Sequence, residues 1–339
     1  MAEDKRPPRS DAPGRTCPPS YAYSPRTFAR PADLTTDVLY VVGGLYGNAF
    51  AFDAIEHLAE HEPFGPTVVF NGDFHWFDAD PGHFDEIQRR VLACTALRGN
   101  VETEIASDDD AAGCGCAYPE SVPDDDVARS NTILARLRDV AAQVAGSQAA
   151  LRDLKMHAVA QVGGARIAIV HGDAWSLAGW RFAHNRLHGS ALADAPNAAP
   201  DATLDAALEL AAVDGFACSH TCAPALKSTA RGFVINNGSA GMANFAATTH
   251  GVITRIATRA LPRALEPVRL YGLNDWIGQR ACFVDALRIE FDLAAWLRRF
   301  DAMWPARSPA AVSYRARIIA GPDYAIDHAL GRAPASCPA

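Results

Sequence analysis

The 339-residue sequence has no apolar stretch that approaches the roughly 20 residues a helix needs to cross a membrane. Its first eight residues contain acidic side chains and two prolines, where a secretory signal would need an apolar run. We therefore expect a cytoplasmic protein that has no membrane partner.

An excess of positive charge is also missing. The sequence has 31 Lys and Arg against 39 Asp and Glu, which gives a formal net charge of -8. A protein that grips nucleic acid or anionic lipid through phosphate charge alone needs a basic surface, so we expect no nucleic-acid groove. An acidic protein that handles phosphate needs a local positive centre, and a metal ion is one way to supply it.

A disulfide framework is the third missing feature. Eight cysteines are scattered along the chain rather than framed as in a small secreted domain, and a reducing compartment would keep most of them as thiols. Internal repeats and long low-complexity tracts are absent as well. The length fits one large α/β domain with extensions, or two modest domains.

Three regions differ in pattern. Residues 1–32 are rich in Pro, Ser, Arg and Asp without hydrophobic periodicity, which predicts a disordered or loosely docked arm. Residues 36–262 alternate β-branched runs with amphipathic segments, interrupted by an acidic, Cys-containing loop at 107–126. Residues 263–339 are predicted to be a C-terminal extension that packs on the core and caps or completes the sheet.

The pattern of residues 36–262 predicts an alternation of strands and helices, and the extension adds further strand-like pieces and one helix. Strands are expected at 38–42, 67–70, up to 97, 157–162, 166–170, 216–218, 233–235, 270–273, 282–284 and 288–291. Helices are expected around 50–58, 84–91, 128–144, 147–156, 202–213 and 293–303.

Four polar residues directly follow predicted strands: Asp73, Asn100, His171 and His220. In an open α/β sheet, the loops that leave the strands gather at one edge and build sites there. A carboxylate, an amide and two imidazoles form a plausible ligand set for Zn, Mn or Fe. The competing interpretation is that the Asp and Asn form turns and that both histidines are structural.

The order of short motifs resembles that of the calcineurin-like metallophosphoesterases over roughly residues 36–245. The matching motifs are Gly72 with Asp73, Gly99 with Asn100, His171 with Gly172, the Ser-His-Thr-Cys of residues 219–222, and the Asn-Asn-Gly-Ser of residues 236–239. The resemblance implies an α/β fold, a four-layer α/β/β/α sandwich that holds two metal ions. It also implies that Asp73 bridges the metals and that Asn100, His171 and His220 complete one of the two sites.

The sequence departs from the family where the first metal would bind. The family opens with Asp-x-His, but this chain has Gly44 and Tyr46; Val101 replaces a histidine that would assist the leaving group, and Cys222 replaces the last histidine. The chain resembles a divergent bacterial subgroup that lacks the Asp-x-His opening and combines a Gly-Gly-x-Tyr opening with a Cys-Gly-Cys loop.

We hypothesise that Tyr46 and Cys222 stand where the first metal of the family would bind, joined there by Cys114 or Cys116 of the acidic loop. These four residues are the candidates for a second metal beside the one at Asp73. The alternatives are a packed tyrosine ring and a flexible loop with exposed thiols. Asn48, His75, Arg98 and Glu102 are candidate substrate-binding or catalytic residues. Asn48 could equally cap the helix that follows it.

The predicted function is hydrolysis of a phosphoric ester, as a phosphomonoesterase or phosphodiesterase acting on a small phosphorylated substrate. A divalent or trivalent metal (Mn, Zn or Fe) would polarise a phosphoryl oxygen and lower the pKa of bound water. Two alternatives stay open: a non-catalytic metal-binding or nucleotide-binding protein on the same scaffold, and an iron-dependent enzyme of other chemistry. The sequence decides neither the substrate nor the oligomeric state.

Overall fold

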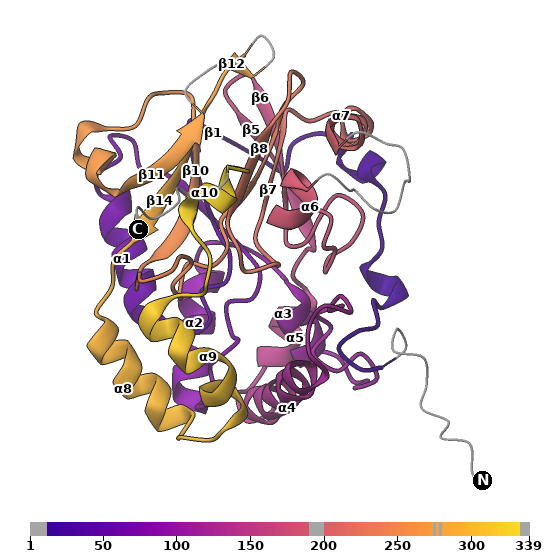
Figure 1. The fold of residues 1–339 in the computed structure, drawn as a ribbon, viewed down its shortest axis with the longest axis vertical. Helices are drawn as coiled ribbons and strands as arrows, with labels where there is room; N and C mark the ends of the chain where they lie inside the picture. The colour runs from indigo at the N-terminus through magenta and orange to yellow at the C-terminus, as the bar shows by residue number, and fades with distance from the viewer. Residues whose placement is uncertain (1–11, 190–199, 274–275, 278–279, 333–339) are drawn as a thin grey trace, which may run out of the picture.

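Two six-stranded sheets pack face to face in the computed structural model, which describes residues 12–189, 200–273, 276–277 and 280–332 (Figure 1). The first sheet has the order β1 (Leu34–Thr36), β5 (His157–Val162), β6 (Ala165–Val170), β7 (Gly215–Cys218), β9 (Phe233–Asn236) and β8 (Ala225–Ser228). The second has the order β11 (Arg269–Leu273), β14 (Phe283–Ile289), β10 (Gly251–Ala257), β2 (Val38–Val42), β3 (Thr67–Asn71) and β4 (Thr95–Leu97). A small ribbon pairs β12 (Trp276–Ile277) with β13 (Arg280–Ala281).

Each large sheet contains a run of parallel strands. Strands β2, β3 and β4 are parallel in the second sheet, and β6, β7 and β9 are parallel in the first. Parallel strands must be buried on both faces, which explains the continuous apolar run of β2. Leu39 and Val41 of this strand face the other sheet, while Tyr40 and Val42 face the helices.

Helices cover the outer face of each sheet (Figure 1). On the second sheet these are α1 (Ala49–Ala59), α2 (Pro81–Leu92), α3 (Asn100–Ile105), α4 (Asp124–Ala141), α5 (Ser147–Arg152), α8 (Leu293–Met303) and α9 (Pro309–Ala320). On the first sheet they are α6 (His184–His188) and α7 (Pro200–Ala211), and a short α10 (Ile326–Ala329) lies near β8. The predicted four-layer α/β/β/α sandwich is therefore confirmed. Within the described residues, no helix combines the length and the apolar character that crossing a bilayer requires.

The N-terminal residues 12–32 differ from the expected disordered arm. They form two 3₁₀ helices, η2 (Pro19–Tyr21) and η3 (Pro25–Phe28), and the rings of Tyr21 and Phe28 are fully buried. The Tyr21 hydroxyl donates to Glu104 at 2.6 Å, and the Phe28 ring packs edge-on against Phe216. Isolated aromatic anchors hold this segment, and they leave no periodic pattern in the sequence. Residues 1–11 lie outside the described part.

The acidic segment at 107–126 also differs in part from the predicted loop. Its last three aspartates, from Asp124 to Asp126, form the first turn of α4, where negative charge interacts favourably with the helix dipole. Cys114 and Cys116 are buried rather than exposed. The remainder is irregular, as expected.

The C-terminal segment completes the second sheet. Strand β14 pairs antiparallel with all seven residues of β10, and it joins the two strand pieces that the sequence predicted separately. A buried ion network supports this edge: Arg255 donates to Glu62 at 2.6 Å and to Asp285 at 3.1 Å, and Arg269 donates to Asp285 at 2.7 Å. Because each buried charge has a partner, the network can lie inside the fold.

Acid is expected to weaken the anchor between β1 and β5. The carboxylate of Asp33 accepts a hydrogen bond from the Val159 amide at 2.8 Å. It also lies 2.7 Å from Arg30 and 3.2 Å from Lys155. Burial opposes ionisation, but the hydrogen bonds from Arg30, Val159 and Lys155 outweigh it and hold the pKa of Asp33 below its usual range.

Because the pKa of Asp33 is lower in the folded protein, its carboxylate stabilises the fold at pH values above the unfolded pKa of about 3.9. This stabilisation is lost as the pH falls below that value toward the folded pKa. We expect Asp33→Asn to lower the free energy of unfolding by about 1 kcal/mol at pH 7, with the difference shrinking below about pH 4. Urea titrations of both proteins at pH 7 and pH 3 would measure this. A difference that stays constant over that range would contradict the assignment.

Candidate metal centre

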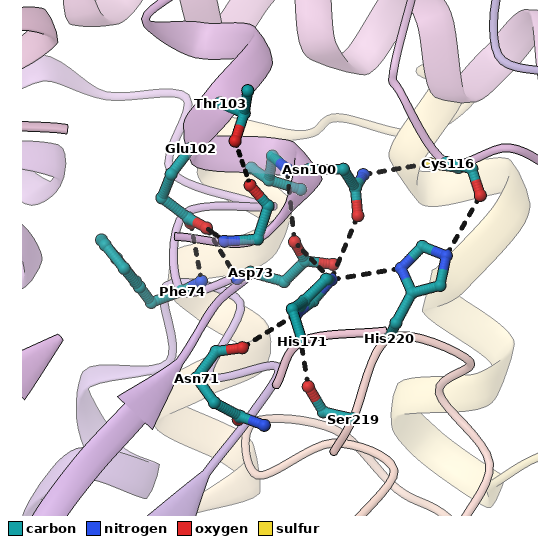
Figure 2. Close-up of polar contacts among 12 residues, drawn as sticks. Asn71, Asp73, Phe74, Asn100, Glu102, Thr103, Cys116, His171, Ser219 and His220 are labelled. Carbon is teal, nitrogen blue, oxygen red and sulfur yellow. Dashed lines mark hydrogen bonds and ion pairs between the residues drawn. The ribbon is translucent and has the colours of Figure 1, made fainter. Parts of the chain in front are cut away.

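Four buried polar side chains meet at the edge where the parallel strands end (Figure 2). Asp73 follows β3, Asn100 follows β4, His171 follows β6 and His220 follows β7. The structure thus brings together all four residues that the sequence predicted as one ligand set.

Side-chain atoms of the other three residues lie close to one nitrogen, His171 Nε2. His171 Nε2 is 3.1 Å from Asn100 Oδ1, 3.3 Å from Asp73 Oδ1 and 3.1 Å from His220 Nδ1. One ligand atom each from Asp73, His171 and His220 can be chosen so that all lie within 4.8 Å of one another, the spacing of a candidate metal site. Among the described residues, no second group of His, Cys, Asp and Glu shares this spacing.

Backbone carbonyls decide which atom each ligand presents to the cluster. His171 Nδ1 donates to the Asn71 carbonyl at 2.9 Å, and His220 Nε2 donates to the Cys116 carbonyl at 3.1 Å. The Asn100 amide nitrogen donates to the Cys114 carbonyl at 2.9 Å, which turns Oδ1 toward the cluster. These partners assign the tautomers and the amide orientation.

With both imidazoles neutral, four lone pairs converge and no proton lies among them. The arrangement needs a positive charge, which a proton on His171 or a metal ion would supply.

Burial lowers the pKa of His171, but the adjacent Asp73 carboxylate raises it above its ordinary value. Burial and the neighbouring His171 lower the pKa of His220 to about 3. Burial opposes the ionisation of Asp73, yet His171 and His220 keep its pKa below normal. Asp73 and His220 are thus in the protonation states that metal binding requires.

Two glycines allow the loops to approach this closely. A Cβ atom on Gly99 would lie 2.4 Å from Asp73 Oδ1 and 2.8 Å from His171 Cε1. Gly72 has φ +102°, and a Cβ there would lie 2.5 Å from the Gly99 nitrogen. A side chain at either position would push the ligands apart.

Glu102, a candidate substrate-binding or catalytic residue, is not among the residues that line the pocket and instead holds the ligand loops. Its buried carboxylate accepts hydrogen bonds from the backbone amides of Asp73 at 2.8 Å, Phe74 at 2.9 Å and Gly99 at 2.8 Å. Figure 2 shows this carboxylate directed at the loop after β3. It therefore ties the loop that carries Asp73 to the start of α3.

A pocket of about 190 Å³ opens onto the cluster. Asp73 and His220 form part of its wall, and aromatic rings supply much of the rest. Its lining residues are Tyr46, Asp73, Trp76, Val101, Cys116, Tyr118, Trp180, His220, Thr221, Cys222, Tyr314 and Arg317.

Tyr46 and Cys222 lie together in this pocket, with the hydroxyl oxygen and the sulfur 2.7 Å apart. Burial raises the pKa of both groups, and the neighbouring Cys222 raises that of Tyr46 further. Of the two other predicted thiols, Cys116 also lines the pocket, whereas Cys114 does not. Cys116 Sγ is 3.4 Å from the Asn100 amide nitrogen, and Cys114 Sγ packs toward Gly14. The structure thus joins Tyr46 with Cys222 but does not join Cys114 to them.

Three further candidate residues from the sequence analysis have side chains that lie outside the pocket lining. Asn48 caps α1 by accepting from the Ala51 amide and donates to the Gly241 carbonyl, so the capping interpretation is correct. His75 is buried against Asp78, with its Nδ1 2.6 Å from the carboxylate. Arg98 donates to the Arg152 carbonyl at 2.9 Å.

The pocket also contains residues that the sequence analysis missed. They come from the loop after β3, the acidic segment, the loop after β6 and helix α9: Trp76, Tyr118, Trp180, Tyr314 and Arg317. None follows a strand at a motif position. The one available signal was the helical spacing of Tyr314 and Arg317, which puts both side chains on one face of α9.

Comparisons with known proteins identify the fold. No protein-family model matches the sequence, and no curated protein matches it. Among solved structures, a hypothetical protein from Pyrococcus horikoshii OT3 matches with a TM-score of 0.53 and 18% identity, covering 84% of this chain and 99% of that one. A metallophosphoesterase from Sphaerobacter thermophilus matches with a TM-score of 0.50 and 14% identity, again covering 84% and 99%. The chain therefore has the fold of the calcineurin-like metallophosphoesterases, as the motifs of the sequence implied.

Proposed function

We propose that the protein is a metal-dependent hydrolase of phosphoric esters that acts on a small phosphorylated substrate. The observation that carries the proposal is the convergence of four ligand atoms, from Asp73, Asn100, His171 and His220, beside an open pocket whose wall includes Asp73 and His220. This mixed oxygen and nitrogen set suits Zn, Mn or Fe in the divalent state.

A metal held by these four residues would supply Lewis acid charge and a water of lowered pKa. Other residues of the chain hold the four ligands in position. The carbonyls of Asn71 and Cys116 hold the two imidazoles in the ligating tautomers, and such partners typically contribute 10- to 100-fold to metal affinity. Glu102 holds the Asp73 loop in place.

The residue at position 101 limits which esters would react. Val101 lines the pocket and cannot donate a proton to a departing alkoxide. Positioned acids typically accelerate such steps by about 10²- to 10⁴-fold. Esters that release a weakly basic group, such as a phenolate, are therefore the favoured substrates.

The test is hydrolysis of an aryl phosphate monoester and an aryl phosphodiester by protein loaded separately with Mn²⁺, Zn²⁺ and Fe²⁺. The expected result is turnover that depends on the metal and that a chelator abolishes. Metal bound at full occupancy with no turnover for any of the three ions would contradict the hydrolase and support a non-catalytic binding protein on this scaffold.

The contact between Tyr46 and Cys222 favours one second candidate, an iron-dependent enzyme of other chemistry, because phenolate and thiolate both ligate iron. Protein purified without oxygen and loaded with iron would then show a visible charge-transfer band. A colourless protein with phosphatase activity would exclude this candidate.

A further inference from the structure

The guanidinium group of Arg317, on helix α9, lies at the wall of the pocket. Arg317 Nε donates to the Ala243 carbonyl at 3.2 Å, and its Nη2 donates to the Cys222 carbonyl. The group has five N–H donors, so three remain for other partners. Arg317 is among the residues that line the pocket together with Asp73 and His220.

Arg317 differs from its neighbour on the same helix in having no acidic partner. Arg315 forms a bidentate pair with Asp301 at 2.8 and 2.9 Å. Among the described residues, no carboxylate lies within 4.0 Å of the Arg317 guanidinium, and its two hydrogen bonds described above go to neutral carbonyls. A cation with spare donors at the wall of a pocket is suited to bind an anionic ligand, and guanidinium fits phosphate oxygens in particular.

The position of Arg317 matters because of what surrounds it. It lies beside Tyr46 and Cys222, the residues that replace two metal ligands of the family that the sequence resembles. These neutral side chains supply no positive charge. Burial raises the pKa of both groups, and the positive charge of Arg317 offsets only part of this effect. This side of the pocket therefore carries a fixed cation supplied by the protein.

A charge balance supports the same conclusion. A divalent ion at the cluster and the Asp73 carboxylate together give about +1, whereas a phosphate monoester carries about -1.5 to -2 at neutral pH. Arg317 brings the total near zero. Without it, a buried site would hold an uncompensated negative charge, which is costly.

We propose that Arg317 binds the phosphoryl group of the substrate, opposite the cluster of Asp73, Asn100, His171 and His220, and that the ester carries a small aromatic group. The proposal rests on the proposed function, because it names the substrate class of that site.

The aromatic part of the proposal comes from the pocket walls. Trp76, Tyr118, Trp180 and Tyr314 surround the space, and the Trp180 ring lies 5.3 Å from the ring of His220. Aromatic rings attract flat ring ligands by stacking and by edge-to-face contact. A volume of about 190 Å³ is below the 300 Å³ or more of drug-sized sites and near the ~150 Å³ that holds benzene. One ring with a phosphoryl group matches this size.

The first experiment measures binding of inorganic phosphate by calorimetry to zinc-loaded wild type, Arg317→Gln, Arg317→Lys and the control Arg315→Gln. We expect Arg317→Gln to weaken binding about 10- to 100-fold, because a charge-assisted hydrogen bond is lost. Arg317→Lys should retain part of the affinity, because the charge stays while the guanidinium geometry is lost, and Arg315→Gln should bind as wild type does. Zinc content and melting temperature of each variant show that the metal site and the fold are intact.

Unchanged phosphate affinity in Arg317→Gln overturns the proposal, even if the wild type hydrolyses esters. Phosphate binding that depends on Arg317 in a protein without turnover would support the anion site while removing the hydrolase function. The two proposals can therefore fail separately.

The second experiment compares phenylphosphonate with methylphosphonate, which present the same anion and cannot be hydrolysed as esters. Phenylphosphonate is expected to bind about tenfold more tightly in wild type, and Trp180→Ala should remove most of this difference. Equal affinity of the two compounds in wild type would overturn the aromatic part of the proposal.

Discussion

Replacing His171 by alanine is expected to remove the bound metal and to reduce ester hydrolysis by about 10³-fold or more. His171 Nε2 is the atom around which the other three ligand atoms gather, so its loss leaves no shared centre. A Lewis acid contributes several kcal/mol to stabilising the transition state, and each 1.4 kcal/mol corresponds to a factor of ten in rate. Elemental analysis and an aryl phosphate assay on the same preparation would measure both effects.

The matched control is His57→Ala, because His57 lies exposed on α1 and is not among the residues that line the pocket. It should keep wild-type metal content and wild-type activity. Turnover by a metal-free His171→Ala protein would show that the cluster is not the reactive centre.

Replacing Glu102 by alanine is expected to destabilise the fold by roughly 3 kcal/mol or more and to weaken metal binding. The substitution leaves three buried backbone amides without an acceptor, and each costs about 1 to 3 kcal/mol. The Asp73 loop loses its tie to α3, and loss of such support typically lowers metal affinity 10- to 100-fold. Urea denaturation and zinc titration would report the two effects.

Glu102→Gln separates this role from direct chemistry. The amide retains one acceptor oxygen, so both effects should be smaller than in the alanine variant. Exposed Glu60 provides the control, and Glu60→Ala should change neither quantity. A Glu102→Ala protein with normal stability and metal affinity but no activity would restore the original prediction of a catalytic carboxylate.

The ligand set was predictable from the sequence because each ligand directly follows a parallel strand. Within each sheet the carboxyl ends of neighbouring parallel strands meet at one edge, which puts Asp73 near Asn100 and His171 near His220. The face-to-face packing of the two sheets then brings the two pairs together. The packing of the two sheets also brings Tyr46 and Cys222 into contact, since they follow β2 of one sheet and β7 of the other.

Side-chain direction was harder to predict than position. Glu102 lies two residues after Asn100, but as the third residue of α3 its carboxylate folds back to the amide of Gly99. His75 lies two residues after Asp73, yet its ring stacks on Phe84 inside the fold. Nearness to a motif in the sequence therefore does not place a side chain in the pocket.

Two elements left too weak a pattern to be predicted. Strand β10 contains Arg255 within its apolar run, and the buried partners Glu62 and Asp285 come from distant parts of the chain. Helix α9 has few buried residues, and Arg317 lies far along the chain from the last motif. Contacts of this kind depend on the assembled fold and have no local signal.

The most direct test of the central claim is the number of metal ions bound to each chain. Elemental analysis of the purified protein after dialysis against a trace of Zn²⁺ should find about one ion per chain in wild type and almost none in Asp73→Ala. Two ions per chain would show that Tyr46 and Cys222 complete a second metal site and that Arg317 is not the missing charge. No metal in the wild type would contradict the account as a whole.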